Sequence, residues 1–95
     1  VEVRTLLPDP LPGIQVERLH LPPDRAFPGA PHTPGTREYL YCERGQIMLT
    51  ASGVKFTLSA GDVVVFRGDQ RHAYKNVGDG EAVGISVVLL PPPGG

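Results

Sequence analysis

Turn-forming residues at short intervals are the feature of this sequence that most constrains its fold. The 95 residues include 12 glycines and 11 prolines. Together with Asn, Asp and Ser they interrupt every window of about 12 residues, so no segment sustains the i, i+3, i+4, i+7 apolar pattern of an amphipathic helix. The sequence therefore predicts an all-β chain.

Short runs suited to β-strands lie between these turns. Several alternate apolar with polar residues, as a strand with one buried face does. The run DVVVF at 62–66 is continuously apolar, which is typical of a strand buried on both faces. Seven or eight strands at hairpin spacing predict a β-sandwich or barrel. The other predicted strands are 14–21, 36–43, 46–51, 54–59 and 82–90.

The order of these runs predicts one domain with two short appendages. Residues 1–13 are expected to form an N-terminal arm or an edge strand, residues 14–90 the barrel, and residues 91–95 a frayed tail. The proline-rich segment 22–35 is expected to be a loop that ends at the rim of the barrel, because proline cannot donate to a central ladder.

Charge and cysteine content exclude several classes of function. A formal net charge of −1 gives no general attraction to nucleic acid or to an anionic membrane. A single cysteine, Cys42, excludes an internal disulfide. The sequence has no apolar run of the roughly 20 residues that a membrane helix needs, and no signal segment opens it. These observations predict a cytoplasmic protein.

Three polar residues are the candidates for a functional site: His32, Glu38 and His72. They come from two separate predicted hairpins, which can face one another across the interior of an antiparallel barrel. His32 and Glu38 are six residues apart, so they share a face if the stretch between them is extended. The intervening TPG leaves that condition open.

The spacing of these residues resembles the two motifs of the cupin superfamily. The first motif, G-x5-H-x-H-x(3,4)-E-x6-G, is matched by His32, Glu38 and Gly45. The second motif, G-x5-P-x-G-x2-H-x3-N, is matched in register by the residues Gly61, His72 and Asn76. The resemblance covers about residues 14–90 and implies a small double-stranded β-helix, the cupin or jelly-roll barrel.

The sequence also departs from these motifs. Pro34 stands where the second histidine of the first motif belongs, which removes a fourth metal ligand and is expected to lower metal affinity. The other departures are Ala26 for the leading glycine, and Arg67 and Asp69 for the middle proline and glycine of the second motif.

A narrower resemblance is to the C-terminal cupin domain of bacterial transcriptional regulators with an N-terminal helix-turn-helix of the XRE type. It rests on PHTPGTREYLYCERGQI (31–47) and LSAGDVVVFRGDQRHAYKN (58–76). The resemblance implies a domain that senses a small-molecule effector and forms a homodimer. DNA would then be contacted only through a domain preceding Val1, and no membrane partner is implied.

The resemblance also implies a metal site at His32, Glu38 and His72. Two imidazoles and a carboxylate suit a divalent transition metal such as Zn, Ni, Fe or Mn. The alternative is a hydrogen-bonded polar cluster that holds no metal. Tyr74, which shares a face with His72, is expected to line a ligand pocket, and so are Leu40 and Cys42, which share a face with Glu38.

Two functions of different class follow. The first is a ligand-sensing and dimerising domain of a transcriptional regulator. The alternative is a stand-alone metal-dependent cupin enzyme, a dioxygenase or an isomerase. The sequence has no nucleophile–base pair, no phosphate loop and no cofactor fingerprint. We therefore assign no catalytic residue and favour the binding module over the enzyme.

The remaining predictions concern structural roles. Gly45 and Gly61 are expected to be turn glycines with positive φ, and Asn76 is expected to close a turn. His20 has no partner in view and is expected to be structural. Tyr39 and Tyr41 are expected on the outer face, for packing or for a dimer interface. The segment 1–7 is the candidate edge strand for dimer formation.

Overall fold

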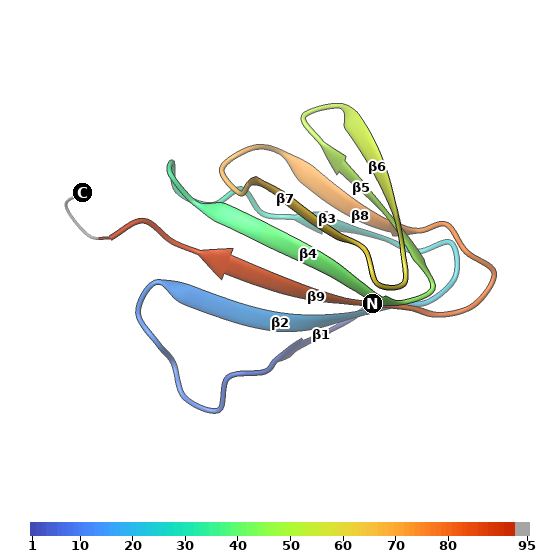
Figure 1. The fold of residues 1–95 in the computed structure, drawn as a ribbon, viewed down its shortest axis with the longest axis horizontal. Helices are drawn as coiled ribbons and strands as arrows, with labels where there is room; N and C mark the ends of the chain where they lie inside the picture. Colours follow the sequence, from blue (N-terminus) through green and yellow to red (C-terminus); the bar gives the residue numbers. More distant parts are fainter. Residues whose placement is uncertain (93–95) are drawn as a thin grey trace.

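The computed structural model describes residues 1–92, and this part of the chain is built from β-strands (Figure 1). Residues 93–95, which belong to the predicted tail, lie outside the described residues. The division into arm, barrel and tail stays a prediction. The nine strands are β1 (Glu2–Thr5), β2 (Ile14–Leu21), β3 (Ala26–Gly29), β4 (Arg37–Arg44), β5 (Gln46–Ala51), β6 (Val54–Ser59), β7 (Val63–Arg67), β8 (His72–Asn76) and β9 (Ala82–Leu89).

The strands form two antiparallel sheets that face each other. The five-stranded sheet has the order β1-β2-β9-β4-β7, and the four-stranded sheet has the order β3-β8-β5-β6. Neighbours in each sheet are mostly distant in sequence, which is the crossing pattern of a jelly roll (Figure 1). The predicted all-β double-stranded β-helix is confirmed.

The core lies between the two sheets and follows from the alternation along each strand. In β4, Glu38, Leu40 and Cys42 point inward and are buried, while Arg37 and Tyr41 point outward and are exposed. The inward residues of the opposite sheet meet them, with Ile47 and Leu49 fully buried. Burying each such aliphatic side chain contributes about 1.5–3 kcal/mol to folding.

The segment 22–35 contains a strand, so the prediction that it is a loop throughout was wrong. Residues 26–29 form β3, which pairs with β8 at the edge of the four-stranded sheet, with Pro28 opposite Ala73. An edge strand uses the ladder on one side only, and a proline whose missing N–H faces away from the sheet is therefore tolerated. The exclusion of a central strand holds.

The prediction that the run 62–66 is buried on both faces was also wrong. β7 is the edge strand of the five-stranded sheet, and Val63 and Val65 are 61% and 51% exposed. Only Val64 and Phe66 turn toward the core. A continuous apolar run indicates a strand, but it does not reveal whether another layer of the same chain covers its outer face.

Two turns at the ends of the sheets depend on particular residues. Gly45 has φ +76°, and a Cβ there would lie 2.6 Å from the backbone oxygen of Glu81, so the turn after β4 requires glycine. Gly61 also has positive φ, as predicted. Fully buried Asn76 closes the turn after β8: its side chain accepts from Gly78 N–H at 2.9 Å and donates to Gly80 and Leu21 carbonyls at 2.8 Å.

Candidate functional site

His32, Glu38 and His72 meet between the two sheets. Glu38 lies on β4 and His72 on β8, while His32 lies in the loop between β3 and β4. The Glu38 Oε1 atom is 3.8 Å from His32 Nε2 and 3.7 Å from His72 Nε2. The two imidazole rings stack with their centroids 6.5 Å apart. The structure therefore brings together the three residues that the sequence singled out.

His32 reaches this position through a turn and not through an extended strand. Its backbone N–H donates to the Gly68 carbonyl at 2.8 Å, and Gly68 N–H donates to Thr36 at 2.9 Å. Thr36 N–H donates back to Thr33 at 3.2 Å, which closes the TPG turn. His32 and Glu38 therefore do not meet because an extended strand places them on one face. The loop after β7, through Gly68, positions His32 instead.

Glu38 is almost completely buried and is held through one of its two oxygens. Tyr74 O–H donates a hydrogen bond to Glu38 Oε2, and Ser86 Oγ lies 3.2 Å from the same atom. Burial, with the adjacent Glu38 carboxylate as a smaller cause, raises the pKa of Tyr74 above its ordinary value, so its hydroxyl remains a donor. With Oε2 occupied, Oε1 is turned toward the two imidazoles.

The orientation of the His72 ring is fixed from its other side. Its Nδ1 lies 2.9 Å from the Gln70 carbonyl, which can only accept, so Nδ1 carries the proton. A neutral His72 then presents an Nε2 lone pair toward the Glu38 carboxylate. Both atoms have lone pairs of the kind that coordinate a divalent transition metal.

Gly29 is a site residue that sequence reasoning missed. It lies on β3 directly opposite His72, and a Cβ there would lie 2.2 Å from His72 Nε2. Only a residue without a side chain leaves room for the imidazole. No sequence signal marked this role, because Gly29 falls in the proline-rich segment that was predicted to be a loop.

The three residues line an inner cavity of about 300 Å³ between the sheets. Tyr74 lines it too, and its role as a ligand-pocket residue stays a prediction. Leu40 and Cys42, predicted to line a pocket, do not: they lie in the core and are fully buried. Burial raises the pKa of the Cys42 thiol, which suits a structural role. Glu17 of β2 lines the cavity as well and was not predicted.

The donor atoms of His32, Glu38 and His72 are of the types that a divalent transition metal prefers. Their positions match a metal site less well. Within residues 1–92, no group of three or more His, Cys, Asp or Glu side chains is arranged to hold a metal ion. Bonds of about 2.1 Å in a tetrahedral site place two donors roughly 3.4 Å apart. The separations of 3.7 and 3.8 Å from Oε1 exceed that by a few tenths of an ångström. The metal site stays a prediction.

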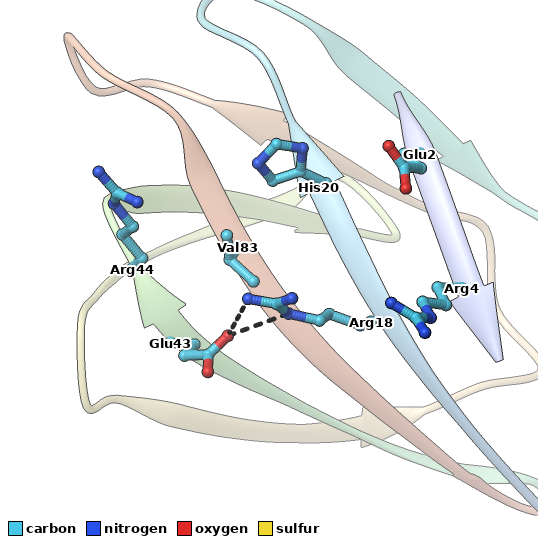
Figure 2. A pocket seen from close by; sticks show the side chains of 7 residues that line it. All are labelled: Glu2, Arg4, Arg18, His20, Glu43, Arg44 and Val83. Atoms are coloured by element: carbon cyan, nitrogen blue, oxygen red, sulfur yellow. Dashed lines mark hydrogen bonds and ion pairs between the residues drawn. The ribbon is translucent and has the colours of Figure 1, made fainter. Parts of the chain in front are cut away.

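A second hollow, of about 480 Å³, lies on the outer face of the five-stranded sheet (Figure 2). Arg18 pairs there with Glu43, with its NH2 group 3.3 Å from Glu43 Oε2. His20, which was expected to have no partner, forms an ion pair with Glu81. Both residues of each pair are more than two-fifths exposed, so water screens these contacts.

Two antiparallel sheets enclosing a cavity with a polar cluster define a jelly-roll barrel. The chain belongs to the cupin family, whose profile, described as Cupin domain, matches residues 17–88. This confirms the family resemblance seen in the sequence. No curated protein matches the chain significantly.

Solved structures give a similar result. The chain is similar to the cupin domain of an XRE-family transcriptional regulator from Enterobacter cloacae, with a TM-score of 0.89 and 26% identity over 96% of this chain and 97% of that one. It is also similar to an HTH_3-family transcriptional regulator from Vibrio cholerae, with a TM-score of 0.85 and 25% identity. That match covers 95% of this chain and 51% of the regulator, so the chain spans about half of its length.

An enzyme-related structure is similar as well. A predicted oxalate decarboxylase from Thermotoga maritima has a TM-score of 0.72 and 25% identity, over 81% of this chain and 66% of that one. In the part of the chain that the structure describes, no helix has the length and apolarity to cross a membrane.

Proposed function

We propose that this chain is the ligand-sensing domain of a bacterial transcriptional regulator that acts in the cytoplasm. A small effector binds in the inner cavity and shifts the equilibrium of a homodimer. DNA is contacted by a helix-turn-helix domain of the same protein and not by the cupin barrel. The effector must favour one state of the dimer, with a coupling free energy of about 1–3 kcal/mol.

The observation that carries this proposal is the cavity itself. It combines apolar walls with a small number of convergent polar groups, which is the usual composition of a small-molecule site. The similarity to the Enterobacter cloacae regulator domain along nearly the whole of both chains supports a regulator over other cupins.

The homodimer is supported by the outer face of the five-stranded sheet. Tyr41 lies opposite Val63 and Tyr39 opposite Val65, which makes a patch of apolar side chains across β4 and β7. Tyr41, Val63 and Val65 are 41%, 61% and 51% exposed. Apolar patches of this kind are typical of interaction surfaces. The free edge of β1, the strand formed by part of segment 1–7, is the other available route to pairing.

Light scattering tests the homodimer. The wild-type chain is expected to have twice its monomer mass, and Val65→Asp to be monomeric while its circular dichroism stays that of a β-protein. Val54→Asp, at a site 55% exposed on β6, is the matched control and should remain a dimer. A monomeric wild type at working concentrations would contradict this part of the proposal.

The coding sequence upstream of Val1 tests whether this chain is part of a transcriptional regulator. We expect the reading frame upstream of the codon for Val1 to encode about 60–80 further residues with three or more short helices, one of them basic. The full-length protein should then bind its own upstream DNA with an affinity that changes on addition of an effector. A start codon directly before Val1 would overturn the regulator.

A divalent metal held by His32, Glu38 and His72 is a finer part of the proposal. Zn, Ni, Mn or Fe would each accept this donor set. At a concentration 100 times its Kd, a metal that binds only the folded state raises stability by about 2.7 kcal/mol. Thermal unfolding of the chelator-treated protein should rise in temperature on metal addition, and His72→Ala should abolish the rise. An equal rise in His72→Ala would place the metal elsewhere.

The donor set also favours one alternative function, a metal-dependent enzyme such as a dioxygenase or an isomerase. The similarity to a predicted oxalate decarboxylase is consistent with it. Turnover of a small carboxylic acid that depends on added metal and is lost in His72→Ala would establish the enzyme. Effector binding without product supports the sensor.

A further inference from the structure

The inner cavity carries an excess of negative charge. Its polar lining consists of Glu17, Glu38, Tyr74, Ser86 and two histidines, with no lysine or arginine. Glu17 and Glu38 supply two carboxylates, and no lysine or arginine on the cavity wall offsets them. A cavity of this charge attracts cations and disfavours free carboxylates and phosphates, since a like charge would enter a partly desolvated site.

Glu17 and Glu38 lie on the two strands that flank β9, the strand that carries Ser86. Glu17 of β2 lies opposite Ser86 of β9, and Ser86 Oγ is 3.2 Å from Glu38 Oε2. β9 separates β2 from β4, and Ser86 lies opposite Leu40, two residues along β4 from Glu38, so the backbones at Glu17 and Glu38 are roughly 12 Å apart. Both side chains line the same cavity of about 300 Å³, which leaves room for a small ligand beside them.

Glu17 differs from Glu38 in its partners. Glu38 accepts hydrogen bonds from Tyr74 and Ser86 and faces two imidazoles. Glu17 belongs to none of the ion pairs formed within residues 1–92. It is half-buried on the cavity wall that Tyr74 also lines. A carboxylate in this position lacks only a cationic partner.

The rest of the wall suits a hydrocarbon group. Val3, Leu19, Phe27 and Val88 line the same cavity. Phe27 stacks on Tyr74 with ring centroids 6.2 Å apart, so an apolar surface continues up to the polar cluster. A ligand with a short alkyl chain and one charged end matches this division of the wall.

We infer that the effector cavity selects a small organic cation, a primary amine whose ammonium is anchored by Glu17 and whose alkyl part lies against the apolar wall. This inference rests on the proposed function, since it names the chemical class of the effector. It does not require a metal, and a metal bound at Glu38 would compete with the amine by adding positive charge.

Three probes with four carbon atoms each test it on the chelator-treated chain: n-butylammonium, n-butanol and butyrate. Binding is followed by isotope-edited amide NMR, which measures weak affinities and locates the site. n-Butylammonium is expected to bind about tenfold or more tightly than butyrate, with shifts at amides around the cavity, and n-butanol to lie between them. Glu17→Gln should reduce the preference to about threefold or less.

Glu2→Gln is the matched control. Glu2 lies on the neighbouring strand β1 but on the outer face, in the hollow of Figure 2, so its loss removes the same charge without touching the cavity. This variant should retain the full preference for the amine. Adding zinc at saturating concentration should weaken n-butylammonium binding in the wild type and leave butyrate unweakened.

The contradicting outcomes are distinct. Butyrate binding in the cavity as tightly as the amine would overturn the class of ligand while leaving a small-molecule cavity, and with it the proposed function, intact. An unchanged preference in Glu17→Gln would overturn the role of Glu17. If no probe binds in the cavity up to about 100 mM, the inference is overturned. The regulator is then judged separately by effector-dependent DNA binding of the full-length protein.

Discussion

The inner cavity and the outer hollow lie on opposite faces of the same sheet, and their charges have opposite character. Adjacent residues of β2 supply both, with Glu17 lining the cavity and Arg18 the hollow. The cavity has two carboxylates and no fixed cation. The hollow has three arginines, Arg4, Arg18 and Arg44, against two glutamates, Glu2 and Glu43 (Figure 2). Successive side chains of a strand point to opposite faces of the sheet, so a shift of one residue moves a charged side chain from the cavity to the outer hollow.

The difference between the two regions shows that burial, more than the number of charges, decides what a polar group does. The pair of Arg18 and Glu43 is about half exposed, so water competes for both partners and the pair contributes little. Glu38 is 1% exposed, and its contacts with Tyr74, Ser86 and the imidazoles replace the water that it has lost. The cavity is therefore where substitutions should have large effects.

The largest effect is expected from Gly29→Ala. The added Cβ would lie 2.2 Å from His72 Nε2, so the imidazole or strand β3 must move. We expect a loss of about 3 kcal/mol in the free energy of unfolding, measured by urea denaturation. Gly80→Ala, where nothing lies within 4 Å of the added Cβ, should lose less than about 1 kcal/mol. Equal losses in the two variants would contradict the close contact at His72.

Tyr74→Phe should have the next largest effect. It removes a hydrogen bond to a buried carboxylate, and such bonds contribute about 1.5–3 kcal/mol. We expect a loss of about 2 kcal/mol in urea. Tyr41→Phe on the exposed outer face, with no hydrogen bond found for its hydroxyl in residues 1–92, should be close to neutral. If both changes were neutral, Glu38 would not depend on Tyr74.

The pH dependence of stability tests the buried environment of Tyr74 beside Glu38. The pKa of Tyr74 is raised in the folded state, mainly by burial, so the folded state holds this proton more tightly than the unfolded state does. The contribution of this protonated hydroxyl to the free energy of unfolding is fully present below about pH 10, the pKa of an unfolded tyrosine. It falls at higher pH, and at pH 11 the free energy of unfolding is lower by about 1.4 kcal/mol. Thermal unfolding between pH 8 and 11 should decline more steeply in the wild type than in Tyr74→Phe. Parallel declines would contradict the raised pKa.

The smallest effect is expected in the outer hollow. Arg18→Gln removes the exposed pair with Glu43 and should cost no more than about 0.5 kcal/mol, and less at high salt. A double-mutant cycle with Glu43→Gln measures the coupling directly. A coupling above about 2 kcal/mol would mean that the outer hollow is as strongly organised as the cavity, and the contrast between the two would fail.

Local patterns in the sequence predicted most of the fold. Alternation gave residues 14–21, 46–51 and 54–59 with the bounds that β2, β5 and β6 have. The errors concern the position of a strand within its sheet and whether another part of the chain covers its outer face. The run 62–66 is equally apolar whether its outer face is covered or exposed, and Pro28 is allowed in β3 only because that strand is at an edge. Such properties belong to the assembled sheets and not to a segment.

The candidate site was predictable only in part. His32, Glu38 and His72 were found through family motifs. The structure places both imidazoles within 4 Å of the Glu38 Oε1 atom. Glu17 and Gly29 lie outside those motifs, and their roles depend on the register of β2 with β9 and of β3 with β8. Leu40 and Cys42 share a face with Glu38, yet shared parity does not distinguish the core from a cavity wall.

The most direct test of the account is to map where a small ligand binds on the chelator-treated chain, using amide NMR shifts with n-butylammonium. The account predicts saturable shifts confined to the inner cavity, at Glu17, Gly29 and Tyr74, with none in the outer hollow. Shifts centred on Arg4, Arg18 and Arg44, or shifts that do not saturate anywhere, would contradict the claim that the inner cavity is the ligand site.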